Sequence, residues 1–217
     1  MSCFSHSRSD IEYGVDSMTT PCCSGRPEFR SRIGLWVIAL LFLLLPPSLA
    51  ASQELATENP YKVKAAFLRN FAHYVTWPVD AFPESSSSWC IGILGRDPFG
   101  EVLETTFKGR TEQGHAFDIF RADTPDELPA CQIVFVAYKD AAKRRTVLGE
   151  LKDKPVLTVG DAPEFLREGG VIRFQVSDRV RMSINLDQAR AVALTIQTRM
   201  LEVSSEVLEN GVVRQMR

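Results

Sequence analysis

The sequence is poor in the residues that metal centres need. Its 217 residues include only three histidines and five cysteines, and no HxxH or HExxH pattern occurs. Zinc sites require several His, Cys, Asp or Glu side chains at short spacing. The scarcity of His and Cys and the absence of such spacings argue against a metal centre.

Motifs for nucleophilic catalysis and for nucleotide binding are also missing. No Gly-x-Ser-x-Gly sequence is present, and the glycines at 92, 95 and 100 do not have the spacing of the dinucleotide fingerprint. Asp97 and Asp161 each follow a predicted strand, where open α/β sheets bind ligands, but two such acids are a weak indication of catalysis. We therefore expect a protein that is not an enzyme and needs no cofactor.

Charge of one sign does not dominate the chain. Lys and Arg number 25 against 27 Asp and Glu, which leaves a net charge of −2. Such a balance creates little positive electrostatic potential that would attract nucleic acid or an anionic membrane. We expect no nucleic-acid partner.

One long apolar run is present, and it is too short to cross a membrane. Residues 33–45 read IGLWVIALLFLLL, after three arginines and before two prolines. A spanning helix needs about 20 apolar residues, whereas a basic start, an apolar stretch of this length and small residues such as Ser48 and Ala50 are typical of a cleaved signal peptide. The sequence predicts a signal peptide at 1–50, which has an ordinary length if it starts at Met18, and a single domain at 51–217.

Two cysteines, Cys90 and Cys131, remain after that cleavage. An even count in an oxidising compartment indicates a disulfide, whereas two buried free thiols would be expected in the cytosol. Each cysteine begins an apolar, strand-like run. Neighbouring parallel strands lie about 4.8 Å apart, which is within reach of a disulfide. We predict that the two cysteines are bridged.

Alternating strands and helices indicate an α/β fold. Asn59-Pro60 has the pattern of a helix start, and Trp77-Pro78 the pattern of its end. The run at 131–137 is apolar without alternation, as in a strand buried on both faces. We predict a single three-layer domain with a mostly parallel central sheet flanked by helices. The expected strands are 89–94, 116–121, 131–137 and 156–159, and the expected helices include about 100–107 and 140–151.

The C-terminal part has a different pattern. Residues 171–176 and 179–186 alternate around Ser177-Asp178, which predicts a β-hairpin with one buried face. A long final helix is expected after Asp187, its predicted cap. The apolar seam of that helix would pack on the sheet or serve as a dimer interface, and comprises Val192, Ala193, Ile196, Met200, Val203 and Val207.

Two groups of residues are candidate binding sites. The first is the turn at Gly95, Arg96, Asp97 and Gly100, which either holds an anion at a helix start or only connects a strand to a helix. The second is the polar face of the hairpin. It is either solvated or docks an acidic partner, and its arginines are Arg173, Arg179 and Arg181.

Five blocks of the chain, taken together, resemble the YfiR family of periplasmic proteins. They run in order through the predicted domain: YKVKAAFLRNFAHYVTWP (61–78), CIGILGRDPFG (90–100), CQIVFVAYKD (131–140), PVLTVGD (155–161) and GGVIRFQVSDRVRMSINLDQARAVAL (169–194).

The resemblance implies a dimeric, non-enzymatic regulator in the periplasm. YfiR-type proteins inhibit an inner-membrane diguanylate cyclase through its periplasmic sensor domain, and an outer-membrane lipoprotein can sequester them. Cys90 and Cys131 match one family disulfide, but no cysteine follows Cys131 to form the second. Related domains serve other membrane signalling proteins, so a small-ligand sensor for such a protein is the alternative function.

Overall fold

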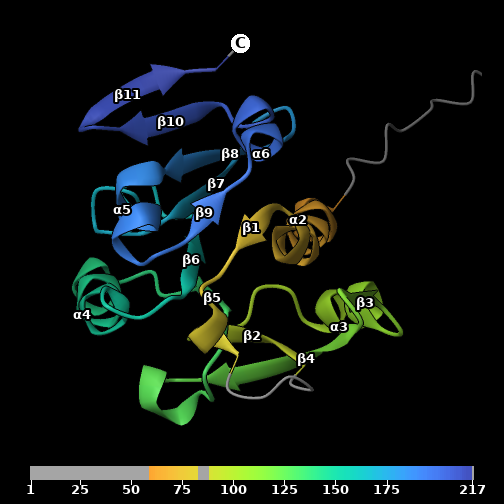
Figure 1. Ribbon diagram of the computed structural model, residues 1–217. Helices are drawn as coiled ribbons and strands as arrows, with labels where there is room; N and C mark the ends of the chain where they lie inside the picture. The colour runs from red at the N-terminus through yellow and green to blue at the C-terminus, as the bar shows by residue number, and fades with distance from the viewer. Residues whose placement is uncertain (1–58, 83–87, 217) are drawn as a thin grey trace, which may run out of the picture. The chain divides into compact units, whose positions relative to one another are not determined.

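The computed structural model describes residues 59–82 and 88–216, and the predicted signal peptide lies outside them. These residues fold into alternating helices and strands, labelled in Figure 1. The first half comprises α2 (Pro60–Tyr74), β1 (Val75–Thr76), the 3-10 turn Val79–Ala81, β2 (Trp89–Leu94), α3 (Glu101–Phe107), β3 (Thr111–Glu112), β4 (His115–Ala122), the 3-10 turn Pro125–Glu127 and β5 (Ile133–Val136). The second half comprises α4 (Ala141–Leu151), β6 (Leu157–Gly160), β7 (Ile172–Val176), β8 (Val180–Asn185), α5 (Leu186–Ala191), β9 (Thr195–Ile196), α6 (Thr198–Glu202), β10 (Glu206–Glu209) and β11 (Val212–Gln215).

Nine of these strands form one sheet, in the order β11-β10-β8-β7-β6-β5-β2-β4-β3. The central strands β4, β2, β5, β6 and β7 are all parallel. Antiparallel pairs occur where β7 meets β8, where β10 meets β11 and where β3 meets β4. The predicted mostly parallel sheet is confirmed.

Helices cover both faces of this sheet, which gives the predicted three layers. Alternate residues of a strand point to opposite faces, so Ile91 and Ile93 of β2 pack in one core, under α2 and α3. Leu94 lies in the other core, with Val147 and Leu148 of α4. Figure 1 shows α4 on the side of the sheet away from α2 and α3.

The first helix contacts the last third of the domain. Asn59 caps α2 by accepting the Tyr61 N–H at 3.0 Å, as the sequence predicted. The ring of Phe71 stacks on that of Phe174 in β7, with centroids 6.0 Å apart. Directly after α2, β1 pairs with β9, so that Val75 lies opposite Ile196. The start of the described domain is therefore held by residues near its end.

The predicted hairpin is present, with one difference in its buried face. β7 and β8 pair in register, and Ile172 and Ile184 are fully buried. Val176, expected inside, is 55% exposed at the tip. On the face expected to be polar and open, Ser183 is fully buried, because β10 pairs with β8 and places Glu206 opposite Ser183. The polar face is thus open only near the turn.

The prediction of a long final helix was wrong. The helix α5 ends after six residues, Ala193 adopts a left-handed φ of 57°, and β9, α6, β10 and β11 follow. Asn185 caps α5 by accepting the Gln188 N–H at 3.0 Å, whereas Asp187 accepts the N–H groups of Asn210 and Gly211. Of the predicted seam, Val203 is exposed and Val207 lies in β10.

Candidate functional site

The connections after β2 and β5 leave the sheet in opposite directions. β2 is followed by α3 and then by β4 on one side, while β5 is followed by α4 and then by β6 on the other. A crevice forms at the carboxyl ends of the strands at such a switch point, where open α/β sheets bind ligands. A cavity of about 890 Å³ opens here, lined by Tyr61, Arg96, Asp97, Pro98, Phe135, Ala137, Tyr138, Lys139, Arg144, Asp161, Ala162 and Pro163.

The turn after β2 supplies one wall of this cavity. Gly95 has a left-handed φ of 88°, and a Cβ there would lie 2.8 Å from the ring of Tyr138. Asp97 accepts the Phe99 N–H at 2.7 Å and is paired with Arg121 at 2.8 Å. Arg96 is exposed beside it and lines the cavity. Gly100 precedes α3 with a φ of 54° and is not among the lining residues.

Arg144 of α4 organises the loop after β5. Its guanidinium forms a two-point ion pair with Glu168, with distances of 2.7 and 2.8 Å. It also donates to the backbone carbonyls of Tyr138 at 3.1 Å and Lys139 at 2.6 Å. The pKa of Arg144 is raised, chiefly by the hydrogen bond to Glu168. This arginine therefore fixes the loop from which Tyr138 and Lys139 face the cavity.

The end of β6 and the first turn of α2 form the opposite wall. Asp161 is paired with the buried Lys64, whose Nζ lies 3.0 Å from the carboxylate and 4.5 Å from the centre of the Tyr61 ring. Burial, and next the charge of Asp161, raise the pKa of Tyr61. Behind Ala162, the ring of Phe165 leaves no room for a Cβ at Gly160, which would approach within 2.6 Å.

The tyrosines and carboxylates that line this cavity are held by other groups of the protein. Burial, and next the nearby charge of Asp123, raise the pKa of Tyr138, whose hydroxyl donates to the Asp123 carbonyl. Both tyrosines are therefore neutral at physiological pH. Both lining carboxylates are already paired with cations. Among residues 59–82 and 88–216, no three His, Cys, Asp or Glu side chains gather as a metal site would require.

The three arginines of the hairpin do not form one surface. Arg173 donates to the Pro163 carbonyl at 2.6 Å and pairs with Glu206 at 3.0 Å, so its charge is used within the fold. Hydrogen bonds from Gln215 and Ser183 and the charge of Arg173 lower the pKa of Glu206, against the opposing effect of burial.

The other two arginines lie at the tip. Arg179 and Arg181 are exposed, and Arg181 is paired with Asp178 at 3.0 Å. A hydrogen bond from the Ser177 hydroxyl, and next that from Arg181, lower the pKa of Asp178 to about 2. Of the three arginines, only Arg179 and Arg181 therefore remain as a candidate partner surface, near the turn.

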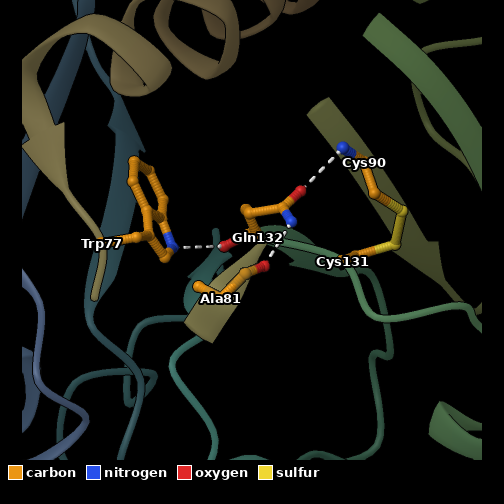
Figure 2. Close-up of a disulfide and its surroundings, with 5 residues drawn as sticks. All are labelled: Trp77, Ala81, Cys90, Cys131 and Gln132. Atoms are coloured by element: carbon orange, nitrogen blue, oxygen red, sulfur yellow. Dashed lines mark hydrogen bonds between the residues drawn. A yellow bond between two sulfur atoms is a disulfide. The ribbon is translucent and has the colours of Figure 1, made fainter. Parts of the chain in front are cut away.

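A disulfide joins the amino ends of β2 and β5, at the end of the sheet away from the cavity (Figure 2). Cys90 and Cys131 are bonded, with their Cα atoms 4.4 Å apart. The buried side chain of Gln132 accepts the Cys90 N–H at 2.8 Å and donates to the Ala81 carbonyl at 2.9 Å. Trp77 donates to the Gln132 carbonyl at 3.2 Å. This network anchors Trp77 and Ala81, which follow α2, to the strand ends that carry the disulfide.

Sequence reasoning found part of the cavity. The turn at 95–100 and Asp161 stood out because they follow predicted strands. Tyr61, Tyr138 and Arg144 did not, since a single aromatic or basic residue carries no periodic signal. The position of Tyr138, directly after the buried β5, is a signal that could have placed it at the same edge of the sheet.

Comparison with known protein families gives a match over most of the described residues. The sequence model of a family described as YfiR/HmsC-like matches residues 61–205, from the first turn of α2 to the residue before β10. A search of curated proteins found no match to the chain.

Proposed function

Because the chain belongs to the YfiR/HmsC-like family, whose members regulate diguanylate cyclase signalling from the periplasm, we propose that it inhibits an inner-membrane diguanylate cyclase by direct contact. It thereby lowers cyclic-di-GMP without catalysing a reaction itself. The single observation that carries this proposal is the family match across residues 61–205. On the same resemblance, we propose a homodimer, and an outer-membrane lipoprotein as a second partner.

The proposal requires export. Residues 33–45 and the Ser48-Leu-Ala50 sequence support a signal peptide cleaved before Ala51. None of the helices in residues 59–82 and 88–216 is long and apolar enough to cross a membrane. N-terminal sequencing of protein from the periplasmic fraction should begin at Ala51 or one residue later. An intact apolar segment recovered with the membranes would contradict export.

The tip of the β7–β8 hairpin is the proposed contact surface. Arg179 and Arg181 are exposed near the turn, and Val176, which points to the opposite face of the hairpin from Arg181, is 55% exposed. Against an acidic sensor surface, the guanidinium groups would form charge-assisted hydrogen bonds, which are stronger than neutral ones. Asp178 weakens the positive charge at the tip, but Arg179 forms no ion pair in the described part of the chain.

The test is charge reversal at the tip. We expect Arg179→Glu with Arg181→Glu to change the free energy of unfolding by no more than about 1 kcal/mol, since exposed substitutions usually have effects within about 0.5 kcal/mol each. Cyclic-di-GMP in cells should rise, and the affinity for the purified sensor domain should fall. The matched control is Arg145→Glu with Lys154→Glu, which reverses two exposed charges in and after α4.

Two results would count against this surface. The first is unchanged cyclic-di-GMP at normal protein levels. The second is an equal rise in the control, which would indicate that total charge matters and the tip does not. If wild-type protein neither binds the sensor domain nor changes cyclic-di-GMP, the cyclase itself is the wrong partner.

A further inference from the structure

The cavity at the switch point has the dimensions of a ligand site. Its volume of about 890 Å³ falls within the range of about 300–1,000 Å³ that is usual for small-molecule pockets. It lies at the carboxyl ends of β2, β5 and β6, between two loops that diverge to opposite faces of the sheet. The hairpin tip is not part of its lining, so the cavity is separate from the proposed partner surface.

The aromatic and proline side chains of the walls are held in place by the protein's own contacts. Tyr61 packs edge-on against Phe99, with ring centroids 5.3 Å apart. Tyr138 lies against Gly95 and is tied to the Asp123 carbonyl. Pro98 and Pro163 add rigid apolar surface. A ligand would find these walls already formed, which reduces the ordering that binding requires.

The charged side chains of the lining determine which ligand charge the cavity favours. Three basic and two acidic side chains line the cavity. Each acid is paired with a cation outside the lining: Asp161 with Lys64, and Asp97 with Arg121, which also pairs with Glu104. By contrast, Arg96 and Lys139 form no ion pair with any carboxylate in residues 59–82 and 88–216. Two cations are therefore free to bind an anion, while no unpaired carboxylate is left to attract a cation.

We infer that this cavity binds a small organic anion, with its apolar body between Tyr61, Pro98 and Tyr138 and its carboxylate at Arg96 and Lys139. Charge-assisted hydrogen bonds from a planar guanidinium suit a carboxylate. An inorganic anion would leave the aromatic walls uncovered, and an uncharged molecule would leave both cations without a partner. The inference concerns the purified protein alone and does not depend on the identity of its membrane partner.

The experiment compares two probes of the same shape. Naphthalene-2-carboxylate and naphthalene-2-carboxamide are each titrated into the ¹⁵N-labelled protein, and inorganic phosphate is titrated separately. We expect the carboxylate to shift the backbone amides of Arg96, Ala137, Tyr138 and Lys139, and to bind at least tenfold more tightly than the carboxamide. Phosphate should bind at least tenfold more weakly than the carboxylate.

Variants connect the binding to the two cations. Arg96→Gln with Lys139→Gln should weaken carboxylate binding at least tenfold, while Arg145→Gln with Lys154→Gln should leave it unchanged. Both variants should retain a dispersed spectrum. The inference is overturned by any of three results: no shifts at the cavity, equal affinity for carboxylate and carboxamide, or equal affinity for carboxylate and phosphate. Equal weakening in the two variants would also overturn it, since only net charge would then matter.

Discussion

The ion pair between Arg144 and Glu168 should be a main electrostatic contribution to the stability of this domain. Their side chains are only 8% and 6% exposed. Two guanidinium nitrogens of Arg144 donate to the two carboxylate oxygens of Glu168, over N–O distances of 2.7 and 2.8 Å. The substitution that tests this is Glu168→Gln, which removes the charge but keeps the size of the side chain. It leaves a buried guanidinium without a counter-charge.

The size of the expected loss of stability depends on the hydrogen bonds that Arg144 keeps in Glu168→Gln. Removing one partner of a buried pair usually lowers the free energy of unfolding by about 3–5 kcal/mol. Arg144 still donates to the carbonyls of Tyr138 and Lys139 and borders a cavity that water can enter. We therefore expect the low end of that range, about 3 kcal/mol. With a urea m-value of about 2 kcal/mol/M, the unfolding midpoint should fall by roughly 1.5 M.

The matched control lies in the same connection. Glu164 pairs with Arg167 at 2.9 Å, but these side chains are 56% and 83% exposed. Glu164→Gln should lower the free energy of unfolding by less than about 1 kcal/mol, since exposed pairs contribute little. Urea titration at pH 7, followed by the fluorescence of the buried Trp77 and Trp89, measures both variants. Equal losses in the two variants would refute the reasoning from burial.

Three further predictions concern other parts of the domain. Replacing Cys90 and Cys131 by Ser should lower the free energy of unfolding by about 4 kcal/mol, because the bond closes a loop with a sequence separation of 41; free thiols in the unfolded, unreduced wild-type protein would contradict the bridge. In an NMR titration, the Asp178 carboxylate should stay ionised until the pH falls toward 2. Its contribution to stability should be complete above its ordinary pKa of 3.8 and should be lost as the pH falls from 3.8 to about 2. Ser177→Ala should raise the pKa of Asp178 more than Arg181→Ala does, and a larger rise in Arg181→Ala would contradict the assigned causes. Gly160→Ala should lower the free energy of unfolding by about 1–3 kcal/mol, because the added Cβ would clash with the ring of Phe165. Gly149→Ala, at a position within α4 where the added Cβ meets no other atom, should raise the free energy of unfolding by about 0.5–1 kcal/mol. A change of the same sign in both variants would refute this prediction.

The pattern of apolar residues along the sequence predicted the elements whose own residues are buried against the sheet or within it. β2 has the expected bounds, and α4 and the β7–β8 hairpin lie close to theirs. Continuous apolar runs identified strands buried on both faces, because a parallel sheet covered by helices leaves no polar face. The amino ends of β2 and β5 then brought the two cysteines together.

The C-terminal segment shows where periodicity fails. Apolar residues at three- and four-residue steps indicated a helix, but tertiary pairing with β1 and β8 determined the structure instead. A turn signal was present in Asn210-Gly211, where both residues have a positive φ, and such a dipeptide is typical of a hairpin. The lining of the cavity was only partly predictable, because it joins single residues from α2, β5 and α4 to three loops that lie far apart in the sequence.

The pairing of β1 with β9 and the stacking of Phe71 on Phe174 also determine when this chain can fold. These contacts join α2 to residues more than half of the described domain away, whereas α3, which also packs against α2, follows it closely in the sequence. Distant contacts of the first kind make folding slow. A chain emerging from the ribosome therefore carries Phe71 without its aromatic partner, and β1 without its paired strand, until the last third of the domain has been synthesised.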